Sequence, residues 1–367
     1  MKPKLLIISR EYAPMIAGVS KYVSEIAKRL NVEKTVLALK VEGRQDRDVE
    51  EVVYPTFAKK RVIKAAYFVL KSVVKSVRND YDVLVGNAFI GGIAGALSKL
   101  FTGKPLVSII YDIDFLDRNA AEYGKVNRFF RKHAIGFILA SSDKIIVDSD
   151  KVEKDIMRLF GTDRQKIVTI PCGITPAGKF RKFGKTSKRV ILFVGNMAEK
   201  KGLTDLVEAM ALVVNKIKNA ELWLVGPDAG LFAQFKKKLQ EIVSKLDLSS
   251  RVKFIGAVKL VEPYYEACDF LVLPSRHSEG FGLPIAEAAS FGKPSVATRI
   301  FEETGVINKK TGLIVPEQNP EKLSEAMLKF VKNKKLRTSM GLNAKKFSKR
   351  FDWDKTANKF EKVINDL

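Results

Sequence analysis

Two glutamates on either side of a glycine-rich turn are the residues of this sequence whose types and spacing best suit chemistry. The segment 275–289 reads SRHSEGFGLPIAEAA, with Glu279 before the turn and Glu287 after it. The apolar run 270–273 before this segment predicts a strand, and Pro284 predicts the first turn of a helix, where a missing N–H costs nothing. Free N–H groups and the helix dipole would attract an anion, which the two carboxylates could contact at different ends. The alternative is an ordinary helix start whose acidic residue complements the dipole.

Three further loops end predicted strands with glycine, which lets backbone approach a phosphate closely. Gly18 follows the first strand, Gly195 follows a strand near the middle of the chain, and Gly226 follows the next one. Lys201 adds a positive charge shortly after Gly195. These loops and the segment 279–287 therefore predict one anion-binding set.

The elements that must position this set alternate between short apolar runs and helix-length segments. Strands are predicted at 4–9, 35–39, 81–85, 105–110, 144–148, 190–194, 220–225, 252–255 and 270–273. Between the third and fourth of these strands, a helix is predicted at 93–99. This alternation is typical of parallel sheets wrapped by helices. Turn residues and a basic stretch interrupt it at 168–189. We therefore expect an α/β fold of two facing, doubly wound Rossmann-like domains, at 1–172 and 173–350, with a ligand cleft between them and a helix in 351–367 that packs back on the first.

Composition narrows the class of protein. Apolar residues make up 46% and charged residues 29% of 367 residues, which are globular values. The apolar run at the amino terminus is too short for a signal peptide and predicts a strand. Two cysteines, Cys172 and Cys268, offer neither a disulfide framework nor a metal site, so we expect a reducing, cytoplasmic compartment. The net charge of +24 predicts attraction to a polyanion, which could be nucleic acid, an anionic membrane or a phosphorylated small molecule.

A basic segment runs from Lys59 to Arg78 without an acidic residue. Helical spacing predicts lysines on one side, with Val62 and Val77 among the apolar residues on the core side. One interpretation is an ordinary packed helix with a solvated basic face. The other is docking on an anionic bilayer together with Phe129, Phe130 and their basic neighbours.

The order and spacing of motifs along most of the chain resemble the retaining glycosyltransferases of family 4, which have the GT-B fold of two Rossmann-like domains. The residues that carry the resemblance are AGV at 17–19, VTIPCG at 168–173, VG at 194–195, KKG at 200–202, LVG at 224–226, YYEACD at 264–269, the paired-glutamate stretch at 274–289, GKPSVAT at 292–298 and TGLIVP at 311–316.

The resemblance implies a role for each matching residue. Glu279 would contact the donor sugar, Glu287 would accept hydrogen bonds from the ribose hydroxyls, and Lys201 would bind the nucleotide diphosphate. Gly18 would let the first loop approach the same phosphates. The backbone that lines the sugar and phosphate site would be that of Gly280, Phe281, Gly282 and Leu283. Gly195 and Gly226 would belong to the same donor site.

Two positions depart from the family pattern. Asn196 stands where an arginine is usual, so one phosphate-binding cation is absent unless Arg276 or Arg299 replaces it. Tyr111 stands where a histidine commonly precedes Asp112. Asp112 follows a predicted strand, and we expect it to contact the acceptor or the sugar.

These observations predict a glycosyltransferase that moves a hexose from a UDP- or GDP-linked sugar to a hydroxyl of a glycan or lipid-linked acceptor, with Glu279, Lys201 and Asp112 as catalytic residues. Fixed cations and N–H groups can stabilise the departing diphosphate, so we expect no metal and no cofactor. Retention would follow from same-face attack, as the resemblance implies. One alternative is a basic nucleic-acid-binding protein without catalysis, although the sequence contains no nucleic-acid recognition motif of the usual kinds. The other alternative is a nucleotide-sugar epimerase of similar fold.

Overall fold

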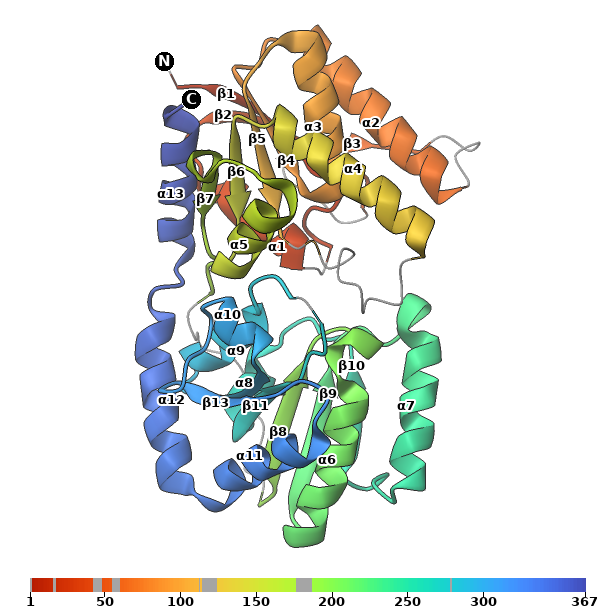
Figure 1. Ribbon diagram of the computed structural model, residues 1–367, viewed down its shortest axis with the longest axis vertical. Helices are drawn as coiled ribbons and strands as arrows, with labels where there is room; N and C mark the ends of the chain where they lie inside the picture. The colour runs from red at the N-terminus through yellow and green to blue at the C-terminus, as the bar shows by residue number, and fades with distance from the viewer. Residues whose placement is uncertain are drawn as a thin grey trace. The chain divides into compact units, whose positions relative to one another are not determined.

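The chain forms two compact units, one of which is built from both of its ends (Figure 1). The computed structural model describes residues 2–15, 18–41, 48–54, 60–111, 113, 124–175, 187–277 and 279–367. The first unit comprises Met1–Gly173 and Asp352–Leu367, and the second comprises Ile174–Phe351. These bounds lie one residue beyond the domain limits that we expected from the sequence.

The first unit contains a parallel sheet of seven strands in the order β3-β2-β1-β4-β5-β6-β7. The strands are β1 Lys4–Ile8, β2 Glu33–Leu39, β3 Val49–Val52, β4 Val83–Asn87, β5 Leu106–Ile110, β6 Lys144–Val147 and β7 Ile167–Thr169. Every residue of β4 and β5 is buried, as expected for strands covered on both faces. The sequence-based prediction missed β3 because its sequence, VEEV, carries two acids at the sheet edge.

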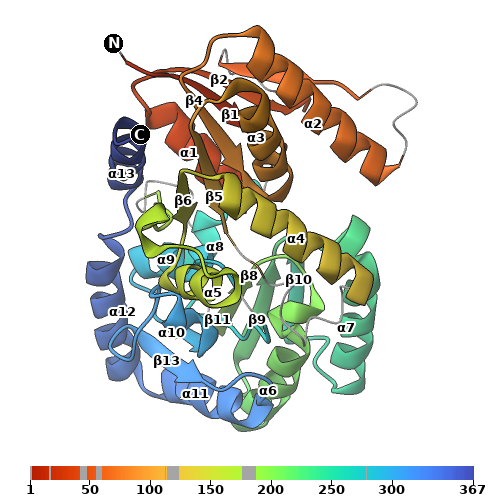
Figure 2. The ribbon, with the colours of Figure 1, turned by 45° about the horizontal axis from the view of Figure 1, so that its top comes forward.

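Helices cover both faces of this sheet. They are α1 Gly18–Arg29, α2 Arg61–Arg78, α3 Ala88–Thr102, α4 Lys125–Ser141, α5 Asp150–Phe160 and α13 Trp353–Asn365, with a 3-10 turn at Arg164–Lys166. The helices α2, α3 and α4 pack side by side in that order (Figures 1 and 2), and α1 packs against α13. Side chains of α4 and α5 share one core cluster with β5 and β6.

The structure extends one of our sequence-based expectations for these helices and contradicts another. We expected a helix at 93–99, and α3 contains this range but begins earlier, at Ala88. Glycine has a low helix propensity, so the pattern did not indicate the start of α3. Packing nevertheless requires glycine there, since a Cβ at Gly91 would lie 2.2 Å from the carbonyl oxygen of Ile8. We also expected Val62 and Val77 of α2 to face the core, whereas they are 79% and 57% exposed.

The buried side of α2 consists of Phe68, Ser72 and Ser76, one turn apart. The serine hydroxyls donate to carbonyl oxygens of the helix itself, Ser72 to that of Phe68 at 2.8 Å and Ser76 to that of Val73 at 2.7 Å. Because their hydroxyls are satisfied locally, these small side chains can be buried where a hydropathy pattern expects valines.

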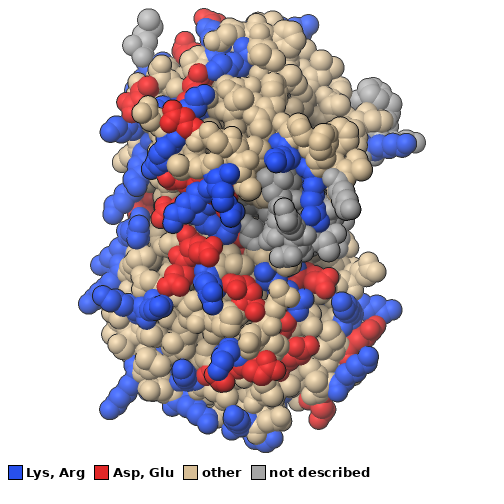
Figure 3. All heavy atoms as spheres, viewed as in Figure 1, with Lys and Arg blue, Asp and Glu red and all other residues tan. Residues whose placement is uncertain are grey.

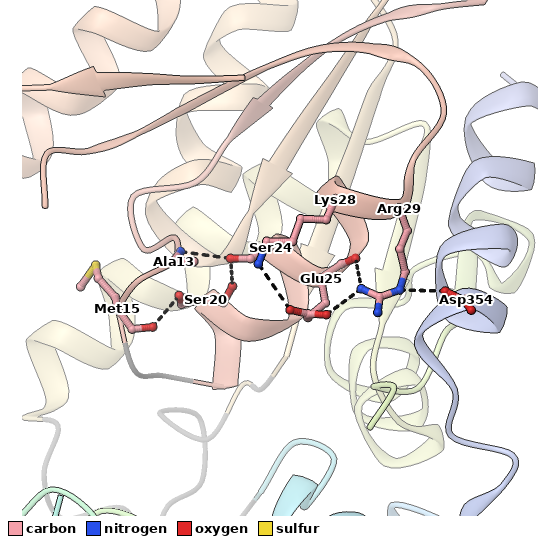
Figure 4. Close-up of polar contacts among 8 residues, drawn as sticks. All are labelled: Ala13, Met15, Ser20, Ser24, Glu25, Lys28, Arg29 and Asp354. Atoms are coloured by element: carbon pink, nitrogen blue, oxygen red, sulfur yellow. Dashed lines mark hydrogen bonds and ion pairs between the residues drawn. The ribbon is translucent and has the colours of Figure 1, made fainter. Parts of the chain in front are cut away.

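The loop after β1 is held on α1 by two serines, as Figure 4 shows. Ser24 Oγ accepts a hydrogen bond from Ala13 N at 3.0 Å, and Ser20 Oγ donates to Met15 O at 2.8 Å. At the other end of α1, Arg29 is paired with Glu25 and donates from Nε to Asp354 Oδ1 of α13 at 2.8 Å. These contacts order the start of α1 and attach α13 to the first unit.

The second unit contains a parallel sheet of six strands in the order β10-β9-β8-β11-β12-β13. The strands are β8 Arg189–Val194, β9 Ala220–Val225, β10 Val252–Gly256, β11 Phe270–Leu273, β12 Ser295–Thr298 and β13 Gly312–Val315. The helices are α6 Leu203–Lys216, α7 Ala233–Lys245, α8 Glu262–Ala267, α9 Leu283–Ser290, α10 Ile300–Glu303, α11 Pro320–Lys332 and α12 Lys334–Ser348, with 3-10 turns at Glu199–Lys201 and Gly230–Phe232. The strand order reverses between β8 and β11, and at such a switch point open α/β sheets bind ligands.

Candidate functional site

Lys201 and Glu279 meet at the switch point of the second sheet. Lys201 ends the 3-10 turn after β8, and Glu279 lies in the loop after the neighbouring strand β11. Lys201 Nζ lies 2.7 and 2.8 Å from the two carboxylate oxygens of Glu279. The two side chains are 20% and 11% exposed, so the pair is largely desolvated and still reachable. Ser275 Oγ also donates to Glu279 Oε1, at 2.7 Å, which orients the carboxylate.

The glycine that follows Lys201 is required by a close approach of backbone. Gly202 has φ +69°, and a Cβ there would lie 1.9 Å from the carbonyl oxygen of Pro274. Arg276 N donates to Lys200 O at 2.8 Å. The turn that carries Lys201 is therefore held directly against the loop that carries Glu279.

Arg276 is paired with a carboxylate of α6. Its Nε and Nη2 donate to Asp205 at 2.8 and 2.5 Å, and the side chain of Asp205 is only 7% exposed. The hydrogen bonds to Asp205 raise the pKa of the Arg276 guanidinium above its usual range. This pairing argues against Arg276 as the replacement for an arginine at position 196, and it gives Arg276 a positioning role. Sequence reasoning missed Asp205, although an acid in the first turn of a helix beside a basic loop was a signal.

Contacts with two core phenylalanines anchor the turn between Glu279 and α9. Phe281 is 4% exposed, and its ring packs edge-on against Phe351 at 5.0 Å. Gly282 has φ +89°, and a Cβ there would lie 2.7 Å from the Phe301 ring. The side chain of Phe281 thus belongs to the core, while the half-buried Gly280 and Leu283 complete the turn.

Glu287 lies in the middle of α9 and is oriented by a buried tyrosine. Tyr265 of α8 donates from its hydroxyl to Glu287 Oε2 at 2.8 Å, and Tyr265 is 1% exposed. Burial, and next the charge of Glu287, raise the pKa of Tyr265 well above its usual range, so the hydroxyl stays a donor. Tyr265 was matched as part of a motif, but its partner only emerges from the fold.

The loops that follow β8 and β9 pack closely against each other through their backbones. A Cβ at Gly226, with φ +139°, would lie 2.0 Å from the carbonyl oxygen of Gly195. The neighbour Asn196 is half-buried. The contact explains the glycine at position 226 without a ligand, and a Cβ at Gly195 would lie 3.2 Å from the Phe193 ring. The part of both glycines in donor binding stays a prediction.

Gly18, in the first unit, is the first residue of α1, and a Cβ there would meet no atom within 4 Å. Asp112 lies outside the described residues. Tyr111 beside it is buried, and its hydroxyl donates to Asn87 Oδ1 at 2.6 Å. Asn87 Nδ2 in turn donates to Ser9 Oγ at 2.8 Å, so Tyr111 belongs to a buried network at the ends of β1, β4 and β5.

The part of the chain that the structure describes contains neither a candidate metal-binding cluster nor a helix that could span a membrane. No group of three or more His, Cys, Asp or Glu side chains there is arranged to hold a metal ion. None of the described helices combines the length and the apolar character that crossing a bilayer needs.

Family models match nearly the whole chain. The model described as Glycosyltransferase Family 4 matches residues 16–177, and the model described as Glycosyl transferases group 1 matches residues 178–347. An uncharacterized glycosyltransferase of Methanocaldococcus jannaschii is 29% identical over 97% of this chain and 96% of its own. A D-inositol 3-phosphate glycosyltransferase of Kineococcus radiotolerans is 24% identical over 95% of this chain and 86% of its own.

Solved structures share the fold over the full length. Sucrose-phosphate synthase from Thermosynechococcus elongatus superposes with a TM-score of 0.87 at 21% identity, covering 100% of this chain and 99% of its own. Anabaena HepE in complex with UDP-glucose superposes with a TM-score of 0.81 at 19% identity, covering 100% of both chains. Two Rossmann-like units, each with its own parallel sheet and strand-order switch, make up the GT-B fold. Because the two glycosyltransferase family models match both halves of the chain, the chain is an enzyme of the group 1 glycosyltransferases.

Proposed function

We propose that this glycosyltransferase moves a hexose from a UDP- or GDP-linked sugar to a hydroxyl of a glycan or lipid-linked acceptor, with retention at the anomeric carbon and without a metal ion. The observation that carries the proposal is the Lys201–Glu279 pair at the switch point of the second sheet. The pair sets a cation and a carboxylate side by side beside the start of α9.

Lys201 suits the leaving diphosphate. An ammonium group has three donors, and two of them lie against the oxygens of Glu279, which leaves one for a phosphate oxygen. The N–H groups at the start of α9 add positive potential. In the transfer, the bond between C1 of the sugar and the phosphate oxygen breaks while C1 bonds to the acceptor oxygen. Negative charge gathers on the diphosphate, where a fixed cation stabilises it most.

The two glutamates suit the two ends of the donor. Glu279 accepts hydrogen bonds from sugar hydroxyls while it holds Lys201, and Glu287, aimed by Tyr265, accepts them from the ribose. The UDP-glucose bound to Anabaena HepE, which shares this fold, supports a nucleotide sugar as donor. The acceptor proton passes to the departing phosphate, which makes a protein nucleophile unnecessary.

The acceptor is the second substrate of the proposed reaction. Asp112 is proposed to contact it, and the D-inositol 3-phosphate glycosyltransferases among the relatives make phosphorylated polyols a reasonable first set to test. Cys172 and Cys268 are buried thiols that form no disulfide with each other, and we propose a reducing cytoplasmic compartment for this chain.

The test is a donor and acceptor screen with purified protein. Thermal shift with UDP- and GDP-linked hexoses identifies the donor, because a ligand that binds the native state raises Tm. NMR of the product then reports the anomeric configuration, and parallel reactions with EDTA report any need for metal. The expected result is an α-linked product from an α-linked donor, formed equally with EDTA.

Three outcomes would overturn parts of this proposal. An inverted product removes retention, and loss of turnover with EDTA that Mg²⁺ restores removes metal independence. An isomerised donor formed without any acceptor identifies an epimerase instead.

A further inference from the structure

An apolar and basic surface covers the helices α2, α3 and α4 of the first unit. Its most exposed apolar side chains are Val62, Leu70 and Val77 of α2, Leu100 and Phe101 of α3, and Val126, Phe129 and Phe130 of α4, which are 57% to 79% exposed. We call the surface that they form the α2–α4 face. Because α2 packs on α3 and α3 on α4, these side chains belong to one layer of helices.

The apolar residues of α4 follow helical spacing on the exposed side. Val126, Phe129, Phe130 and Phe137 recur at intervals of three, four and seven residues, which is the pattern of a buried stripe. They are nevertheless between 37% and 70% exposed. The first unit already has its core on the other side of α4, where Ile135, Ile138 and Leu139 are buried. A contiguous exposed set of this kind marks an interaction surface.

The charge of the face has one sign. None of the sequences of α2, α3 and α4 contains an aspartate or glutamate. Lys71, Arg78 and Lys132 are exposed among the apolar side chains. In the space-filling view, the area over these helices, at the upper right, shows Lys and Arg and much uncharged surface and no acidic side chain (Figure 3). The partner is therefore expected to be both anionic and apolar.

We propose that the α2–α4 face docks on the surface of an anionic phospholipid bilayer. Headgroup phosphates and carboxylates would pair with the lysines and arginines, while the phenylalanine and valine side chains enter the boundary of the acyl chains. The inference deepens the proposed function by favouring a lipid-linked acceptor, and it rests on that function for this point alone. Docking itself requires no turnover.

Two other occupants fit the residues less well. A second copy of the chain would set one acid-free basic face against another, and like charges oppose such contact. Single-stranded nucleic acid is bound by stacking of bases on aromatic rings. Phe101, Phe129 and Phe130 offer rings, but the exposed apolar side chains along α2 are valines and a leucine and offer none. Both occupants are outcomes of the test below.

The test is flotation of the full chain with vesicles of phosphatidylcholine, with or without phosphatidylserine, at low and at high salt. Wild type is expected to float only with the anionic vesicles and less at high salt. The variants Phe129→Ser/Phe130→Ser and Lys71→Glu/Lys132→Glu each change the face, and each removed surface charge is expected to lower partition about fivefold. Circular dichroism checks that the variants keep their fold.

The helix α12 provides a matched control in the second unit. It also lacks acidic residues, and Leu342, Lys335 and Lys346 on it are exposed. Leu342→Ser and Lys335→Glu/Lys346→Glu should float as wild type does. Flotation that survives both face variants, or that falls equally in the α12 variants, would overturn the proposal. So would a wild-type dimer that Phe129→Ser/Phe130→Ser dissociates, or RNA binding without vesicle binding. Because no donor or acceptor is present, failure of the proposed reaction does not affect the result.

Discussion

Arg276 donates two hydrogen bonds to the carboxylate of Asp205, from Nε to Oδ2 at 2.8 Å and from Nη2 to Oδ1 at 2.5 Å. The pair joins the loop after β11 to α6, and both elements adjoin the Lys201–Glu279 pair. The Arg276–Asp205 pair can therefore affect catalysis without contacting the donor. We therefore expect the Arg276–Asp205 pair to help hold Lys201 and Glu279 at their observed separation.

Asp205→Asn tests this positioning role. Loss of the charge leaves Arg276 free to move, so kcat should fall about tenfold, with the KM for the donor changed less. Unfolding free energy should drop by about 2 kcal/mol, below the range for a fully buried pair because Arg276 is partly exposed. Glu208→Gln, which changes an exposed carboxylate on the same helix, should leave both quantities unchanged. Equal loss in the two variants would contradict a specific role for Asp205.

Lys201→Met and Glu279→Gln test the central pair. Each should lower the transfer rate by at least about a hundredfold, because each removes a group aimed at the diphosphate or the sugar. Urea denaturation should show native-like cooperativity for both. Lys200→Met changes the neighbouring lysine and should retain most activity, so a comparable loss there would argue against Lys201 as the specific cation.

Tyr265→Phe tests the orientation of Glu287. Without the hydroxyl, Glu287 Oε2 loses the hydrogen bond from Tyr265, and we expect the donor KM to rise several-fold, about 1 kcal/mol of binding, with kcat nearly unchanged. Tyr264→Phe, at the adjacent position, is the control. A fall in kcat with an unchanged donor KM would show that Glu287 does not hold the ribose.

Gly18→Ala and Gly173→Ala separate two reasons for glycine in the first unit. A Cβ at Gly18 meets no atom within 4 Å, so this variant should keep its Tm and weaken donor binding. A Cβ at Gly173 would lie 2.5 Å from the Trp353 ring, so that variant should lose about 1 to 3 kcal/mol of stability. Thermal unfolding with and without donor measures both effects, and unchanged donor affinity in Gly18→Ala would remove Gly18 from the site.

Burial raises the pKa of Cys268 from 9.0 to about 12, which sets a prediction for pH. The folded chain holds the thiol proton more tightly than the unfolded chain, so this group's contribution to stability is present below pH 9 and declines as pH rises toward 12. In a Cys172→Ala background, Cys268 should resist a thiol reagent at pH 8 until the protein is unfolded in urea. Fast labelling of the native chain would show that Cys268 is accessible.

Much of the fold could be predicted because local patterns carry it. The buried strands β1, β8, β9 and β11 are apolar runs that ended near their observed limits, since both faces of each are covered. The strand β3 and the start of α3 could not be predicted, because the acids of one sit at a sheet edge and the glycines of the other are demanded by contacts with β1.

The sequence by itself determined the family, the parallel α/β architecture and the choice of Lys201, Glu279 and Glu287, because residue type, order and spacing are local properties. Only the tertiary structure decided which side chains meet. It paired Lys201 with Glu279 across 78 positions, turned Arg276 toward Asp205 and aimed Tyr265 at Glu287. It also turned Val62 and Val77 of α2 outward. The physical reason is that pairing and exposure depend on which strands become neighbours and how tightly helices pack, and neither is encoded within any one segment.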